Sequence, residues 1–183
     1  MPSEPHPMTP DLETLSRLFY DALESLGEFT EVAAGELPDA YRGLLAHDAH
    51  MTVSVERFHG GPVSVRVLDR RVTSTHYARK IVLQRESDGR VVQFGIMRVN
   101  FGCLSPEVRA EIQSEAVPLG RILIQHDVLR QVQLFSLWRI TTGAELTRLF
   151  GLQRPGVTYG RTALIDLNGM PAVELIEIVA PVA

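Results

Sequence analysis

The chain has 183 residues, of which 45% are hydrophobic and 22% charged, with a formal net charge of −4 at pH 7. This composition is typical of a soluble globular protein, and we expect one domain over residues 9–183 behind a proline-rich lead, residues 1–8. Scattered positive charges argue against a nucleic-acid partner, and the lack of a long apolar run argues against a membrane partner. The single cysteine, Cys103, fits a reducing compartment, so we expect a cytoplasmic protein.

The first third of the sequence predicts helices. Thr9-Pro10 is a typical helix start, and the apolar residues after it recur at intervals of three and four, which predicts a helix up to residue 26. Residues 28–35 are predicted to form a loop. Pro38 begins a shorter helix, and we expect another over residues 51–58.

From Pro62 onward, apolar and polar residues alternate with the period of two that is typical of strands with one buried face. Strands are predicted over residues 62–68, 77–85, 91–104 and 128–140. Short helices are predicted over residues 105–116, after residue 118, and within residues 142–152. Strands joined by tight turns pair antiparallel, so the expected fold class is α+β with an antiparallel sheet.

The last two predicted strands flank Asn168-Gly169. Asn-Gly between two alternating runs is a strong signal for a two-residue hairpin, because both residues tolerate positive φ. On the second strand Glu177 shares a face with Val173, Leu175 and Val179. An ionised carboxylate in such a row is costly unless a partner neutralises it or its pKa rises. Glu177 is therefore either a functional acid or a strand-end residue that reaches water.

A second charged residue interrupts an apolar strand face. Arg79 lies in the row of Tyr77, Ile81 and Leu83, and the segment Pro118-Leu119-Gly120 begins a helical turn with free amides. An arginine and backbone amides that bind a carboxylate, with a carboxyl group at the far end of an apolar slot, would suit a small aromatic or cyclohexadiene acid.

Six groups of residues occur in a characteristic order. They are Leu44-Leu45 with Asp48 and Met51-Thr52, Tyr77-Ala78-Arg79, Asp88-Gly89, Pro118-Leu119-Gly120-Arg121, Tyr159-Gly160-Arg161, and Gly169-Met170-Pro171 with Glu177. In order and nearly in spacing they resemble the chorismate-pyruvate lyases that make 4-hydroxybenzoate, over roughly residues 40–181. The resemblance implies a sheet of about six antiparallel strands with helices outside, and a ligand buried beneath flaps.

The resemblance also implies an activity, that of a lyase that converts chorismate to 4-hydroxybenzoate and pyruvate. Such a carbon–oxygen lyase needs no cofactor and no metal. Arg79 and the amides of Leu119-Gly120 would hold the ring carboxylate, with Met51 in a flap over it. Glu177 would be the catalytic acid or base beside the 4-hydroxyl.

Two further arginines are candidates for the enolpyruvyl carboxylate, Arg161 and Arg98. The enterobacterial enzymes carry an additional arginine where Ile96 stands here, and Arg98 lies two residues on, on the same face. The segment that leads to Glu177 is one residue longer than in those enzymes, which leaves Glu174 as an alternative acid. In both respects the chain looks similar to the actinobacterial branch of the family.

Other interpretations remain open. The same fold is similar to the ligand-sensing domain of one class of bacterial transcription regulators, so the chain could bind an aromatic acid without reacting it. No helix-turn-helix segment is recognisable before residue 60, which favours the enzyme. A lyase-like enzyme on a chorismate relative is a third interpretation. His47 and His50 have the spacing of two metal ligands, but no suitable third ligand follows them.

Overall fold

The protein is described here by a computed structural model that covers residues 9–182. Seven strands form one antiparallel sheet in the order β1-β5-β6-β7-β4-β3-β2. The strands are β1 (Gly27–Val32), β2 (Val63–Val72), β3 (His76–Arg85), β4 (Val91–Asn100), β5 (Arg130–Thr142), β6 (Val157–Leu167) and β7 (Met170–Val179). The helices are α1 (Leu12–Ser16), α2 (Asp39–Leu45), α3 (Met51–His59), α4 (Pro106–Ser114), α5 (Leu119–Gln125) and α6 (Ala144–Leu149). The α+β class is confirmed, with one strand more than the six expected.

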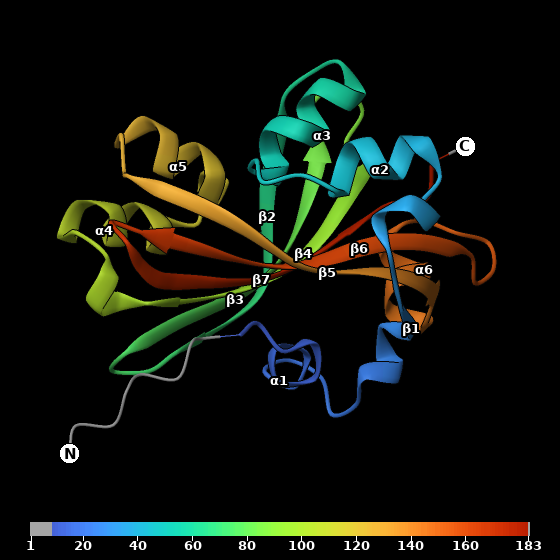
Figure 1. The fold of residues 1–183 in the computed structure, drawn as a ribbon, viewed down its shortest axis with the longest axis horizontal. Helices are drawn as coiled ribbons and strands as arrows, with labels where there is room; N and C mark the ends of the chain where they lie inside the picture. The colour runs from blue at the N-terminus through green and yellow to red at the C-terminus, as the bar shows by residue number, and fades with distance from the viewer. Residues whose placement is uncertain (1–8, 183) are drawn as a thin grey trace.

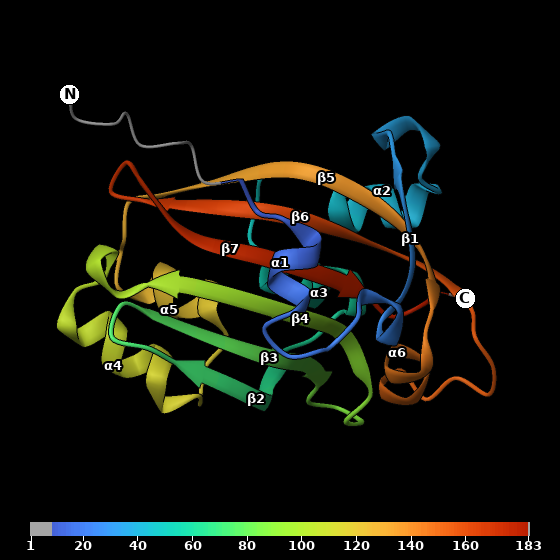
Figure 2. The same cartoon turned by 90° about the horizontal axis from the view of Figure 1, so that it is seen from below.

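The helices lie on both faces of the sheet (Figure 1). Helices α2 to α5 cover one face, and α1 and α6 cover the other, where α1 lies across β4 and β7 (Figure 2). The alternation of side chains along β7 explains the division: Ile176 and Ile178 pack with α1 and α6, whereas Leu175 and Val179 belong to the clusters under α2–α5. The candidate site lies on the face under α2–α5. Among the described residues no helix is both long and apolar enough to span a bilayer.

The hairpin at the end of the chain is confirmed. Leu167 pairs with Met170, and the two residues between them have φ values of 51° for Asn168 and 79° for Gly169. Positive φ at both central positions is the geometry for which Asn-Gly is preferred. The hairpin therefore brings β6 and β7 together in the centre of the sheet.

The prediction for the N-terminal segment is wrong. The helix expected up to residue 26 is only the five residues of α1, followed by a turn and a 3-10 helix, Leu23–Ser25. The apolar residues after α1 are partly buried against the same core cluster, so their spacing reflects burial and not continued helix. Residues 1–8, the expected lead, lie outside the described residues.

The predicted loop at 28–35 is also wrong, because most of it belongs to β1, an edge strand paired with β5. Gly27 begins this strand with φ of 149°, and a Cβ there would lie 2.2 Å from the Thr141 carbonyl oxygen, so only glycine fits. The ring of Phe29 packs edge-on against Trp138 of β5, with 6.2 Å between centroids. A short edge strand with one such contact carries too little alternation to be recognised in the sequence.

Candidate functional site

A cavity lies between the sheet and the first turns of α3 and α5. The space open to the centres of water molecules is about 50 Å³, enough for a few waters at roughly 10–15 Å³ each. The polar side chains that line it are His50, Thr52, Arg79, Gln93 and Glu177, and its apolar lining includes Met51, Ile81, Leu83, Met97, Leu119 and Leu175. The cavity is thus a mostly apolar slot with a few polar groups, as is typical of sites for small organic molecules.

Three neighbouring strands form the floor of this cavity in register. The rows across β3, β4 and β7 are Arg79-Met97-Leu175, Ile81-Gly95-Glu177 and Leu83-Gln93-Val179. Gly95, in the middle of the central row, has no side chain, so the floor is hollow there. Arg79 and Gln93 therefore lie at the two ends of the slot, and the row between them contains Ile81, the hollow at Gly95 and Glu177.

Arg79 is the unusual residue of the site. Its side chain is buried, with 2% of the residue exposed. No carboxylate of the described residues lies within ion-pair distance of it, its Nε has no hydrogen-bond partner, and its Nη1 donates only to the Ile112 carbonyl at 3.3 Å. Burial lowers the pKa of Arg79 from its usual value. A buried guanidinium with spare donors is costly unless an anion joins it.

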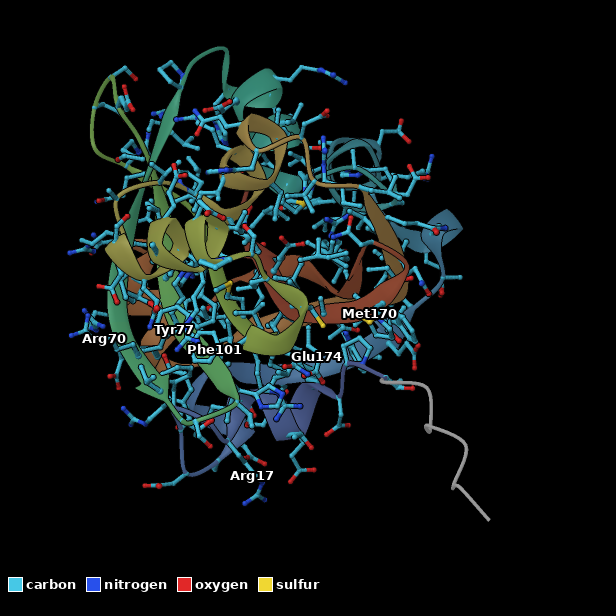
Figure 3. All side chains as sticks on the ribbon, turned by 90° about the vertical axis from the view of Figure 1, so that its left-hand side faces the viewer. Arg17, Arg70, Tyr77, Phe101, Met170 and Glu174 are labelled. Carbon is cyan, nitrogen blue, oxygen red and sulfur yellow. The ribbon has the colours of Figure 1, made fainter. Side chains whose placement is uncertain are left out.

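Glu115 interacts electrostatically with Arg79, but its carboxylate is already hydrogen-bonded to other side chains. Glu115, which attracts Arg79 electrostatically, accepts hydrogen bonds from the Tyr77 hydroxyl at 2.8 Å and from Arg70 Nη1 at 2.9 Å. Figure 3 labels Arg70 and Tyr77, which lie near each other in that view. Burial raises the pKa of Tyr77 to about 12, so its hydroxyl keeps its proton and donates. Glu115 therefore does not neutralise Arg79 directly.

Glu177, unlike Arg79, is paired with a side chain of opposite charge. Its residue exposure is 8%, and its Oε2 accepts a hydrogen bond from Arg161 Nε at 2.7 Å. Arg161 also donates to the carbonyls of His47 at 2.9 Å and Ala49 at 3.0 Å, which fastens the segment before α3 to the sheet. Glu177 is therefore a buried, paired carboxylate on the cavity wall, and the interpretation that it reaches water is wrong.

The two arginines expected to meet a second ligand carboxylate have other partners. Arg161 is bound to Glu177 and to backbone carbonyls, and it is not among the residues that line the cavity. Arg98 makes two hydrogen bonds to Glu174, at 2.6 and 2.9 Å, and it does not line the cavity either. Glu174, the alternative acid, is labelled in Figure 3 and lies outside the cavity lining. The structure therefore brings together Arg79, Glu177, Met51, Leu119 and Gly120, but not Arg98 or Arg161.

Two helices begin at the cavity. The first residues of α3, Met51 and Thr52, and those of α5, Leu119 and Gly120, line it, and neither helix has a side-chain cap. The first amide groups of a helix lack intrahelical partners. The start of the nine-residue α3 therefore offers free N–H donors, which are suited to bind an anion, as the Arg79 guanidinium is.

His50 precedes α3 and lines the same cavity. Arg130 Nε donates a hydrogen bond to His50 Nε2 at 2.8 Å, which requires a neutral imidazole. Burial, followed by the charges of Arg130 and Arg161, lowers the pKa of His50 from 6.5 to about 4. His47, the other candidate metal ligand, contacts the Leu44 carbonyl and Ser54 instead, so the two histidines have separate roles.

A pH dependence of stability follows from His50. The unfolded chain binds this proton near pH 6.5 and the folded protein only near pH 4, so the free energy of unfolding should fall as the pH is lowered between these values. His50→Gln should lose less stability than the wild type over this window, as measured by urea denaturation at pH 7 and pH 5. His47 and His59, whose pKa values are also lowered, remain in both proteins. Equal losses in the two proteins would contradict this role of His50.

The sequence did not predict that three polar residues line the cavity. They are His50, Thr52 and Gln93. Gln93 carried a usable signal, because it is the one uncharged polar residue within the run Val91–Val99 of β4. An amide, unlike a charge, is common on strands, so this pattern alone does not predict a site. Its significance depends on which partners surround it.

Several solved structures have a fold similar to that of this chain. No protein-family model matches the sequence, and no curated protein matches it. The effector domain of PhnF from Mycobacterium smegmatis has a similar structure, with 11% sequence identity and a TM-score of 0.50, over 72% of this chain and 88% of that domain. This chain shares the fold of that effector domain.

Two further solved structures are similar. YydK from Bacillus subtilis, described as a possible transcriptional regulator, gives a TM-score of 0.50 at 14% identity over 64% of this chain, and the match spans 57% of the YydK chain. The gene product SA0254 from Staphylococcus aureus gives 0.51 at 9% identity, over 64% of this chain and 82% of that one. Of these three, YydK is described as a possible transcriptional regulator and the PhnF structure as an effector domain.

The expectation of a chorismate-pyruvate lyase is therefore wrong. The similar structures support the alternative from the sequence, a binding domain of the same fold. The geometry agrees with this correction, because Glu177, the residue expected to act as acid or base, is held by Arg161 in an ion pair. What remains of the resemblance is the fold and the group of residues at the cavity.

Proposed function

We propose that this domain binds a small anionic molecule in the cavity under α3 and α5, without transforming it, and serves as an effector-binding domain. The observation that carries the proposal is Arg79: a guanidinium 2% exposed, without a carboxylate partner among the described residues, on the wall of a cavity. An anion placed there would satisfy its free Nε and remove most of the cost of its burial.

The remaining walls favour an anion with an apolar body. Met51, Ile81, Met97 and Leu175 line the same cavity as Arg79. A carboxylate attached to a ring or a short hydrocarbon would direct its charge to Arg79 and the start of α3, and its body would lie over the apolar floor. Small aromatic acids fit this description, and 4-hydroxybenzoate is a convenient probe.

The pairing of Glu177 with Arg161 supports binding without a reaction. A general acid or base must be free to exchange a proton with the ligand, and the Glu177 carboxylate is instead hydrogen-bonded to buried Arg161. Glu177 and Arg161 together form a fixed wall of the cavity. The PhnF effector domain, with the same fold, supports a role in which binding itself is the activity.

The proposal predicts a strong preference for the charged form of a ligand. In isothermal titration calorimetry, 4-hydroxybenzoate should bind saturably, and its uncharged amide, 4-hydroxybenzamide, should bind about ten- to a hundredfold more weakly, because a hydrogen bond to a charged group is lost. Incubation with chorismate should release no pyruvate. Equal binding of acid and amide would exclude Arg79 as an anion partner, and pyruvate release would contradict a purely binding role.

A further inference from the structure

Gln93 is a second buried polar group without a partner. It lies on β4 with 3% of the residue exposed, and its Oε1 has no hydrogen-bond partner in the structure. A buried amide normally has a hydrogen-bond partner. Without one, it loses the hydrogen bonds to water that it makes in the unfolded chain, and this loss lowers the stability of the fold. Gln93 lines the same cavity as Arg79.

The two unpartnered groups lie at opposite ends of the cavity floor. Arg79 is in the row of Met97, and Gln93 is four residues earlier on β4, which corresponds to about 13 Å between the Cα atoms of Met97 and Gln93. Between them lies the row of Gly95, where the floor is hollow. One elongated molecule could therefore contact both groups, with its body over Gly95.

The backbone is adjusted beside Gln93. The register of β3 and β4 shifts there, so that Leu83 pairs with Gln93 but Gln84 pairs with Val91. The extra residue, Val92, is a bulge, and its side chain packs in the cluster under α2 and α3. Bulges redirect the side chains next to them and are frequent beside binding sites. Here the bulge sets the row in which Gln93 reaches the cavity.

We infer that Gln93 determines which anions bind, by selecting those that carry a hydroxyl at the end remote from the charge. The inference rests on the proposed function, because it assumes an anion at Arg79. The hydroxyl donates a hydrogen bond to Gln93 Oε1, and a ligand of the same shape without it leaves the amide unpaired. A site built around a buried polar group discriminates against such analogues more strongly than an apolar pocket does.

The experiment compares isosteric acids on the wild type. One pair is 4-hydroxybenzoate and 4-fluorobenzoate, and a longer pair is 4-(hydroxymethyl)benzoate and 4-ethylbenzoate. The dissociation constants should favour the hydroxyl member of at least one pair by about tenfold or more. Gln93→Met, which keeps the length of the side chain without its polar atoms, should abolish this preference and still bind the acids. Gln84→Met, on the neighbouring strand and outside the cavity lining, is the matched control and should keep the preference.

The outcomes separate this inference from the proposed function. If both members of each pair bind the wild type equally, or if Gln93→Met keeps the preference, Gln93 is not the selecting residue, although anion binding stands. If no acid binds the wild type, the proposed function fails and this inference fails with it. The wild-type comparison needs no variant, so a failure of Gln93→Met to fold would not remove the test.

Discussion

Arg79→Met is expected to abolish anion binding and, at the same time, to leave the protein as stable as the wild type or more stable. The guanidinium of Arg79 is buried with its Nε unpaired, and its Nη1 makes one long hydrogen bond, to the Ile112 carbonyl. Replacing it by an apolar side chain of similar length should leave the free energy of unfolding unchanged or raise it by about 1–3 kcal/mol. The dissociation constant for 4-hydroxybenzoate should rise at least about a hundredfold, as expected for the loss of a buried charged contact.

The two readouts together distinguish a binding residue from a structural one. Urea denaturation gives the stability of the free protein, and calorimetric titration gives the affinity. A residue that holds the fold together would lower both when it is replaced. A clear loss of stability in Arg79→Met would mean that the fold itself satisfies this charge.

Arg161→Met is expected to have the opposite effect on stability. Arg161 is as buried as Arg79, at 1% exposure, but it is paired with Glu177 and donates to the backbone before α3. Its removal leaves the Glu177 carboxylate buried without a partner, which should lower the free energy of unfolding by about 3–5 kcal/mol. The segment before α3 should also loosen, because it loses its attachment to the sheet.

The comparison of the two variants is internally matched. Both replace a fully buried arginine of an interior strand by methionine. They differ in that Arg161 has a carboxylate partner and several backbone acceptors, whereas Arg79 has no carboxylate partner among the described residues. Denaturation of both proteins under the same conditions provides the measurement. An Arg161→Met variant as stable as the wild type would show that the Arg161–Glu177 pair contributes nothing net, and the contrast between the two arginines would disappear.

Much of the fold is readable from local signals in the sequence. The Asn168-Gly169 turn and the alternating runs on either side of it predict the last hairpin because backbone conformation and burial period agree there. The helix at Met51 is similarly confirmed. Strand β1 could not be predicted, because its place in the sheet depends on β5, more than a hundred residues away in the chain.

Which charged residues of the site are paired is even harder to predict from the sequence than strand β1. Arg79 and Glu177 give the same signal in the sequence, a charge in an apolar row, yet one is unpaired and the other is paired. The difference comes from the irregular register between β6 and β7, where Asp166 pairs with Pro171 but Ile165 pairs with Val173. This one-residue shift sets Arg161 opposite Glu177. A regular hairpin would have placed the two side chains on different faces, so the ion pair could not be inferred from alternation alone.

The Nε–H group of Arg79 offers the most direct test of anion binding. In a ¹H–¹⁵N spectrum that resolves the arginine Nε–H signals, the signal missing from Arg79→Met identifies this residue. Addition of 4-hydroxybenzoate should shift that signal saturably, with the same dissociation constant as in calorimetry, because the free Nε gains a carboxylate partner. Saturable binding that leaves the Arg79 signal unchanged, or no binding of the acid at all, would contradict the assignment of this cavity as an anion site.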